Sequence, residues 1–250
     1  MKLRTEIKLP EFPFKISHQD KILSFGSCFS ENMGEKLKER KFDIFINPHG
    51  ILFNPISISK TINECIENRG YKESDLNENG EIYFSFNHHG NFSGLNPREV
   101  LEGINKKIRE GNSFLKDSSV LILTLGSAWV YRRKANNQVV ANCHKVPNTK
   151  FTKELLSVAE VVNALSKSIS RIKEVNPKIN IITTISPVRH WKDGVVENQQ
   201  SKSTLHLALK ELNETIENLH YFPSYEIMMD ELRDYRFYAK DMLHPSDLAI

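Results

Sequence analysis

The sequence predicts an α/β fold, a three-layer α/β/α sandwich around a central, mostly parallel sheet. Short apolar runs alternate along the chain with amphipathic segments, which is the order of strands and helices that builds a parallel sheet. Residues 120–125, Val-Leu-Ile-Leu-Thr-Leu, are apolar at nearly every position, as expected of a central strand covered on both faces. We expect residues 1–250 to form a single domain, because this length suits one core.

The alternation of strand and helix begins near the N-terminus. Residues 22–25 are apolar and predict the first strand. Ser30 is suited to cap the helix that follows, which we expect to end near Arg40. Residues 42–46 predict the second strand, and Pro55 marks the first turn of the next helix.

A polar segment rich in Asn and Gly, residues 70–96, interrupts this order. It contains one short strand-like piece, residues 82–84, and we expect it to lie beside the sheet as an insertion. The later expected elements are a helix from Pro97 to near Gly111, the strand 120–125, a polar stretch through Asn148, a helix over about 152–175, a strand over 179–185, a helix over about 200–219 and a short helix after Ser224.

Composition and charge exclude several classes of protein. The net charge is +3, from 34 basic and 31 acidic residues, and no basic block interleaves with aromatic residues, so we expect no nucleic-acid partner. Residues 1–10 carry charges where a signal peptide needs an apolar core, so we expect no membrane partner and a cytoplasmic location. Cys28, Cys65 and Cys143 lie far apart in the chain, which argues against a disulfide framework or a zinc knuckle.

The loop after the first strand holds a candidate nucleophile. Residues 26–30, Gly-Ser-Cys-Phe-Ser, lie between a strand and a helix N-terminus. Ser27 would project from the sheet edge beside helix amides that stabilise an oxyanion. The alternative is that Ser27 only caps the helix, and its position alone favours the cap.

The last loop holds a candidate base. Asp241 precedes His244 by three residues, so one turn can place both side chains on the same side. The carboxylate would hold one ring nitrogen and leave the other to accept a proton from a weakly acidic hydroxyl. The alternative is an exposed loop with an incidental Asp and His.

Polar and aromatic residues follow the other expected strands. Because the carboxyl ends of parallel strands share one edge of a sheet, we expect these loops to line one pocket. The loops are Asn47-Pro48-His49-Gly50 with Asn54, Gly126 to Tyr131 with Trp129, Val140 to Lys145 with Asn142 and His144, and Ser186 to His190 with Arg189.

With these residues laid out, the chain resembles the GSCFA family, within the larger group of SGNH/GDSL hydrolases. The first motif reads GSCFS here, with Ser30 where alanine is usual. The resemblance runs from about residue 20 to the end and implies the three-layer fold and ester or acyl chemistry. The other matching stretches are NPHGILFNP (47–55), LTLGSAWVYR (123–132), VANCHKVP (140–147), SPVRHWKDG (186–194), NQQSKSTL (198–205), YFPSYEIMMDELRDYRFY (221–238) and DMLHPS (241–246).

The resemblance assigns roles to individual residues. It implies Ser27 as nucleophile, His244 as base and Asp241 as the group that orients the base. The backbone amides of Cys28 and Gly50 correspond to oxyanion donors.

A third donor of SGNH enzymes is missing. They usually carry an asparagine two residues after the glycine that ends the central strand, and here that position, counted from Gly126, is Ala128. Asn142 is the candidate replacement, and the loss of one donor is worth about 3–4 kcal/mol of barrier.

Two thiols compete with Ser27. Cys28 lies at a helix N-terminus, which lowers the pKa of a thiol. Adjacent side chains leave a turn in different directions, so a pocket-facing Ser27 would turn Cys28 toward the core. Cys143, beside His144, is a weaker candidate.

Basic and aromatic residues leave two further questions open. Arg189, His190 and Lys145 suggest an anionic group on the substrate. Alternatively Arg189 pairs with a buried acid, for which the candidates are Asp193, Asp230 and Glu231. Trp129 and Tyr131 would form a sugar-stacking platform, or they are core aromatics at a strand end.

We expect no metal and no cofactor. The histidines that could converge are His88, His89, His144, His190 and His244. They show no HxH, HExxH or paired CxxC spacing.

The sequence therefore predicts a serine hydrolase acting on a small-molecule or carbohydrate ester. One alternative is an acyltransferase that uses the same residues, and the other is an inactive ligand-binding module. Because the chain stops at Ile250, where a helix is expected in this fold, we expect a version truncated at its C-terminus. The sequence does not indicate an oligomeric state.

Overall fold

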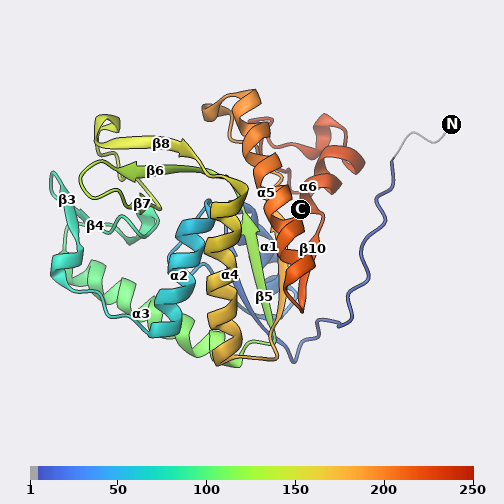
Figure 1. Cartoon of the computed structure of the whole chain (residues 1–250), viewed down its shortest axis with the longest axis horizontal. Coiled ribbons are helices and arrows are strands. Elements are labelled where there is room, and N and C mark those ends of the chain that lie inside the picture. The colour runs from blue at the N-terminus through green and yellow to red at the C-terminus, as the bar shows by residue number, and fades with distance from the viewer. Residues whose placement is uncertain (1–4) are drawn as a thin grey trace.

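A five-stranded sheet forms the centre of the computed structural model, which describes residues 5–250 (Figure 1). Its strands run parallel in the order β10-β9-β5-β1-β2. Helices flank the sheet on both faces, so the predicted three-layer fold is confirmed. The strands are β1 Lys21–Gly26, β2 Asp43–Ile46, β5 Val120–Leu125, β9 Asn180–Ile185 and β10 Leu219–Phe222.

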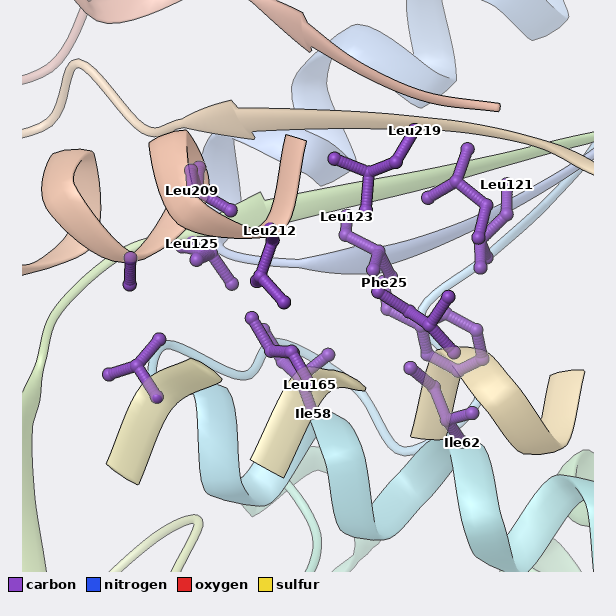
Figure 2. Packing of buried hydrophobic residues seen from close by; sticks show 14 of the residues in the cluster. Phe25, Ile58, Ile62, Leu121, Leu123, Leu125, Leu165, Leu209, Leu212 and Leu219 are labelled. Atoms are coloured by element: carbon purple, nitrogen blue, oxygen red, sulfur yellow. The ribbon is translucent and has the colours of Figure 1, made fainter. Parts of the chain in front are cut away.

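The larger part of the core lies on one face of the sheet. Side chains alternate across a strand, so Leu23 and Phe25 of β1 reach this face while Ile22 reaches the other. Figure 2 shows Phe25 and Leu123 packed toward Ile58 and Ile62 of the covering helix α2. The helices are α1 Cys28–Glu39, α2 Pro55–Glu67, α3 Pro97–Asp117, α4 Val158–Val175, α5 Val195–Thr215 and α6 Ser224–Glu226, with a π-helical turn at Ile227–Glu231.

The opposite face carries a smaller apolar cluster. Ile22 and Val120 form part of it, and α1 contributes Leu37. The extended N-terminal segment adds Phe12 and Phe14, whose rings stack on each other and lie against the ring of His220. The N-terminal segment therefore helps α1 to cover this face of the sheet.

The helix expected over 152–175 begins later. Residues 151–155 instead form strand β8, which pairs antiparallel with β6, Trp129–Arg133, while β7, Val139–Val140, pairs with the other side of β6. Ser157 starts α4 with a capping box, because its hydroxyl accepts from the Glu160 amide and the Glu160 carboxylate accepts from the Ser157 amide. The polar stretch expected after β5 is thus largely a three-stranded sheet.

Two other helix boundaries differ from expectation. Helix α3 continues past Gly111 to Asp117, because Gly111 is a packing glycine: a Cβ there would lie 2.8 Å from Cys65 Sγ. Helix α5 runs from Val195 to Thr215, earlier at both ends than the expected 200–219.

The predicted insertion does lie outside the central sheet. Strands β3, Asn77–Asn79, and β4, Ile82–Phe84, form a separate two-stranded hairpin within residues 70–96. Figure 1 shows this hairpin and the β6–β8 sheet grouped at one end of the molecule. None of the helices within residues 5–250 is both long and apolar enough to cross a membrane.

Candidate active site

A cleft of about 570 Å³ opens at the carboxyl edge of the central sheet. The loops after β1, β2, β5 and β9 and the last loop of the chain all contribute to its walls, as predicted for a parallel sheet. Its lining residues are Cys28, Phe53, Asn54, Ser127, Trp129, Tyr131, Val140, Ala141, Asn142, Cys143, Val188, Arg189, His190, Trp191, Lys192, Asp193, Leu243 and His244. Ser27, Gly50, His144 and Asp241 are the predicted site residues outside this lining.

Asp241 holds the imidazole of His244 in the predicted manner. Nδ1 of His244 donates to Asp241 Oδ2 at 2.6 Å. The other carboxylate oxygen accepts from the backbone amides of His244 and Leu243, at 3.0 and 2.9 Å. These two amides and the imidazole lower the pKa of the Asp241 carboxyl to about 2. With Nδ1 engaged, Nε2 is the ring nitrogen available to the cleft, which His244 lines.

Ser27 lies differently from the prediction. It occupies the N-cap position of α1, but its side chain makes no capping hydrogen bond. The residue is fully buried, and its Oγ has no hydrogen-bond partner among residues 5–250. Ser30, the expected cap, instead lies inside α1 and shares a 2.6 Å hydrogen bond with the hydroxyl of Ser24.

Cys28 is the residue of the first motif that reaches the cleft. It is the first residue of α1 and is half-buried. Burial raises the pKa of its thiol, while the N–H groups of Phe29 and Cys28 and the charge of Lys202 act to lower it. The nearby carboxylate of Glu31 raises it.

Gly26 fixes the geometry of this turn. Its φ of +151° and its close contact with β5 both require glycine, because a Cβ would lie 2.3 Å from the carbonyl oxygen of Thr124. The tight packing of β1 on β5 sets the position from which α1 starts, and therefore the position of Cys28.

The expected oxyanion donors are only partly available. The amide of Gly50 donates to the carbonyl of Asn47 at 2.8 Å, so this predicted donor is already used within its turn. Asn142 lines the cleft as predicted, and its Oδ1 accepts from the His144 amide at 2.8 Å. Asn54 also lines the cleft. Its Oδ1 caps α2 through the Ser57 amide at 2.8 Å, which leaves the Asn54 NH₂ group as a fixed donor.

Arg189 has no carboxylate partner within residues 5–250. Of the acids proposed for it, Asp193 pairs with Lys153 at 2.6 Å and Asp230 with Arg233 at 3.4 Å. The Nε atom of Arg189 is buried without a hydrogen-bond partner among the described residues. Arg189 and the neighbouring His190 both line the cleft, where burial lowers the pKa of His190 to about 4. Lys145 is exposed and lies outside the lining.

The two aromatic residues of β6 form part of the cleft wall. The indole of Trp129 donates to the carbonyl of Glu197 at 3.1 Å, and the ammonium of Lys153 lies 4.6 Å from its ring centroid. Trp129 and Tyr131 are both partly exposed. They are therefore positioned to contact a ligand rather than to fill the core.

Two of the predicted histidines, His190 and His244, line the cleft, whereas His144 and His88 lie outside its lining. His144 turns away from the cleft lining, with Nε2 within hydrogen-bonding distance of the carbonyls of Ser85 and His88 and its ring stacked on Phe84. His88 stacks on His49, with ring centroids 4.2 Å apart. No group of three or more metal-ligating side chains occurs in the part of the chain that the structure describes.

One face of α5 supplies groups from the matched stretch 198–205 to which the sequence analysis assigned no role. Asn198 Oδ1 accepts from the His190 amide at 2.9 Å, and Ser201 Oγ accepts from the Ala128 amide at 2.7 Å. Lys202 Nζ donates to the carbonyls of Gly126 and Ser186, both at 2.7 Å. The sequence carries a signal that could have identified these residues. Polar residues recur there at helical spacing, in a stretch where a helix that covers a sheet needs apolar residues.

Fold and site together define a class of protein: an α/β sandwich whose carboxyl-edge cleft contains a thiol and a carboxylate-held imidazole. The GSCFA family model matches residues 21–250, so the chain belongs to the GSCFA family. The search of curated proteins found no match to the chain.

Proposed function

We propose that the protein is an acyl-transfer enzyme that hydrolyses esters, similar in plan to SGNH hydrolases, with Cys28 as nucleophile and His244 as base. The observation that carries the proposal is that Cys28 and the Asp241-held imidazole line the same cleft. A nucleophile, a base and an orienting carboxylate are the groups that ester cleavage requires.

The proposed reaction proceeds through a thioester. The thiol proton of Cys28 moves to Nε2 of His244 as the sulfur adds to the ester carbonyl carbon. The C–O bond then breaks, and the alcohol leaves with the proton from His244. Water next gives a proton to His244 as its oxygen adds to the thioester carbonyl. The C–S bond breaks, the sulfur regains the proton, and the carboxylic acid is released. An alcohol in place of water makes the same enzyme an acyltransferase.

Ser27 is the nucleophile that the sequence predicts, and it stays the second candidate in this proposal. Its hydroxyl is fully buried and unpartnered, so it would have to rotate or the turn would have to move before it could meet a substrate. Cys28 needs no such movement, because it already lines the cleft. The geometry therefore favours the thiol.

The substrate we propose carries an anionic group. Arg189 lines the cleft without an acidic partner among residues 5–250, and a guanidinium binds carboxylate or phosphate through paired hydrogen bonds. The apolar wall that includes Trp129 and Tyr131 suits the rest of such a molecule.

The test compares Cys28→Ala, Ser27→Ala and Cys65→Ala on two 4-nitrophenyl esters, the neutral acetate and the carboxylate-bearing glutarate. We expect Cys28→Ala to lower kcat/KM by about 10³-fold or more. Ser27→Ala should stay within about threefold of wild type, and the core thiol variant Cys65→Ala controls for general effects of losing a thiol. The glutarate ester should be the better substrate of the wild type.

The same comparison can overturn the proposal. Activity that survives in Cys28→Ala and disappears in Ser27→Ala would assign the nucleophile to the serine. Activity that survives both changes, or a wild type that cleaves neither ester nor labels with a thioester-forming acyl probe, would favour the binding-module alternative.

A further inference from the structure

The loop after β5 turns one hydroxyl toward the cleft. Ala128, which stands in place of the expected donor asparagine, is fully buried and belongs to the main core cluster. The preceding residue, Ser127, lines the cleft instead. The hydroxyl of Ser127 is therefore the polar side-chain group that this turn offers to a bound molecule.

Two neighbours hold the Ser127 hydroxyl. Its Oγ accepts from the backbone amide of Trp129 at 3.0 Å and lies 3.2 Å from the hydroxyl oxygen of Ser201 on α5. The Ser201 Oγ in turn accepts from the backbone amide of Ala128 at 2.7 Å. A hydroxyl has one proton to donate and two lone pairs that can accept. The direction of the hydrogen bond between the two serines therefore decides which of them keeps an unused proton.

Burial favours one of the two directions. Ser201 is 2% exposed, does not line the cleft, and makes no other side-chain hydrogen bond within residues 5–250. If Ser127 donated to Ser201, the proton of Ser201 would be buried without an acceptor, which is unfavourable. If Ser201 donates, both lone pairs of Ser127 are filled, and the proton of Ser127 is left for a molecule in the cleft.

Backbone contacts place Ser127 beside the other parts of the proposed site. The Ser127 amide donates to the carbonyl of Phe53 at 3.0 Å, directly before the cleft-lining Asn54. The Leu52 amide donates to the carbonyl of Gly26 at 2.9 Å, at the start of the turn that carries the proposed nucleophile. This short segment therefore joins the loops that follow β1 and β5, which are neighbouring strands of the sheet.

We propose that Ser127 is a catalytic residue whose hydroxyl donates to the oxyanion, and that Ser201 is the positioning residue that directs this hydroxyl. The proposal rests on the proposed function, because that reaction creates the oxyanion. When the sulfur of Cys28 adds to the ester carbonyl carbon, the π electrons move to the carbonyl oxygen and the thiol proton moves to His244. The Ser127 hydroxyl donates a hydrogen bond to this negative oxygen and keeps its proton.

The test measures the affinity of phenethyl trifluoromethyl ketone, with the adduct detected by ¹⁹F NMR. The nucleophile adds to the ketone carbon and its proton moves to His244, so the adduct carries the same negative oxygen as the reaction. We expect Ser127→Ala to weaken ketone binding by about 10²-fold, and Ser127→Thr, which keeps a hydroxyl, to recover most of the loss. The corresponding trifluoromethyl alcohol forms no adduct, so it should bind wild type and Ser127→Ala with the same affinity.

Ser201→Ala tests the direction of the hydrogen bond and leaves Ser127 in place, so it also serves if Ser127→Ala does not fold. If Ser201 donates in wild type, its loss frees the Ser127 hydroxyl to rotate, and the ketone should bind severalfold more weakly. Unchanged or tighter binding would mean that Ser127 donates to Ser201, which would overturn the proposal. The matched control is Ser168→Ala, which removes a buried hydroxyl pair with Ser59 outside the cleft lining and should leave ketone binding unchanged.

The remaining outcomes separate this proposal from the proposed function. Equal ketone affinity in wild type and Ser127→Ala would exclude Ser127 as a donor and leave the proposed function intact. A wild type that forms no adduct would refute both. Equal losses of ketone and alcohol binding in Ser127→Ala would show that the change disturbs the cleft as a whole, and would therefore also count against Ser127 as an oxyanion donor.

Discussion

In the proposed function, base catalysis depends on the orientation of a single imidazole, that of His244. Asp241 accepts the Nδ1–H of His244 and two backbone amides of the same turn. The left-handed backbone of Met242, with φ of 60°, closes that turn. The carboxylate therefore folds the last loop and, in the proposed function, also selects the tautomer that leaves Nε2 able to accept a proton.

Asp241→Asn separates these two functions. The amide oxygen can still accept from the backbone, but the NH₂ group cannot accept the Nδ1–H, so the imidazole turns over or changes tautomer. We expect kcat to fall by about 10²–10⁴-fold while the melting temperature changes little. Steady-state kinetics on the glutarate ester and a thermal melt measure both.

A matched control lies in the same tail. Asp234→Asn alters an exposed side chain that caps the turn Tyr235–Phe237 through the Arg236 amide and has no hydrogen bond to an imidazole within residues 5–250. Its kcat should match wild type. Equal losses in the two variants would show that the effect comes from the tail fold rather than from His244.

At the scale of elements, the start of α2 links the helix to the cleft. Asn54 caps α2 through the Ser57 amide and lines the cleft with the same side chain. The capping bond fixes the amide plane, so the NH₂ group is held as a donor for an oxyanion. We propose that Asn54 serves as an oxyanion donor in place of the Gly50 amide, which is engaged within its own turn.

Substitutions at two caps test this assignment. Asn54→Ala should destabilise the protein by about 1 kcal/mol and lower kcat by about 10²–10³-fold. Asn54→Ser keeps a capping oxygen but lacks the NH₂ donor, so it should keep the stability and lose the activity. Urea unfolding and ester kinetics give the two quantities.

Ser157→Ala is the control for the cap itself. Ser157 caps α4 with a capping box and does not line the cleft. Its loss should likewise destabilise the protein by about 1 kcal/mol and leave kcat unchanged. A fully active Asn54→Ser protein would exclude Asn54 as a donor.

At the scale of the whole molecule, buried histidines couple stability to pH. His88 is fully buried, stacked on His49 and set edge-on to Tyr71, and neither of its ring nitrogens has a hydrogen-bond partner among residues 5–250. Burial lowers the pKa of His88 well below 6.5. Below pH 6.5 the unfolded chain therefore binds a proton that the folded protein does not bind. The contribution of His88 to the free energy of unfolding is complete above pH 6.5 and decreases as the pH falls below that value.

His88→Phe tests this dependence. The ring keeps the stacking but cannot take up a proton in the unfolded chain. Between pH 6.5 and 5, wild type should lose roughly 1 kcal/mol of unfolding free energy per pH unit more than the variant. Urea unfolding at several pH values measures it, and the exposed His18→Gln should follow wild type. If the unfolding free energies of wild type and His88→Phe change in parallel with pH, His88 is not the cause of the pH dependence.

The local pattern of the sequence was sufficient to predict the central strand of the sheet and the Asp241–His244 pair of the candidate site. Residues 120–125 form the central strand as predicted, and Pro55 and Pro97 begin helices, because apolar runs and proline act on the backbone within a few residues. The pairing of Asp241 with His244 was equally accessible, since both groups lie within one turn.

Contacts between distant segments determined the rest. Residues 151–155 form a strand because β6 offers an edge, and Gly111 stays inside α3 because Cys65 packs on it. Likewise, Cys28 lines the cleft and Ser27 is buried in a turn that starts where Gly26 of β1 packs against Thr124 of β5.

The sequence by itself determined that this protein is an α/β sandwich of the GSCFA family with a carboxylate-held imidazole near its end. Only the tertiary structure decided that Cys28 rather than Ser27 lines the cleft and that the buried ammonium of Lys202 donates to the carbonyls of Gly126 and Ser186. The physical reason is that strand and helix patterns are encoded over a few residues. The direction of a side chain and the charges around it depend on segments that are far apart in the chain.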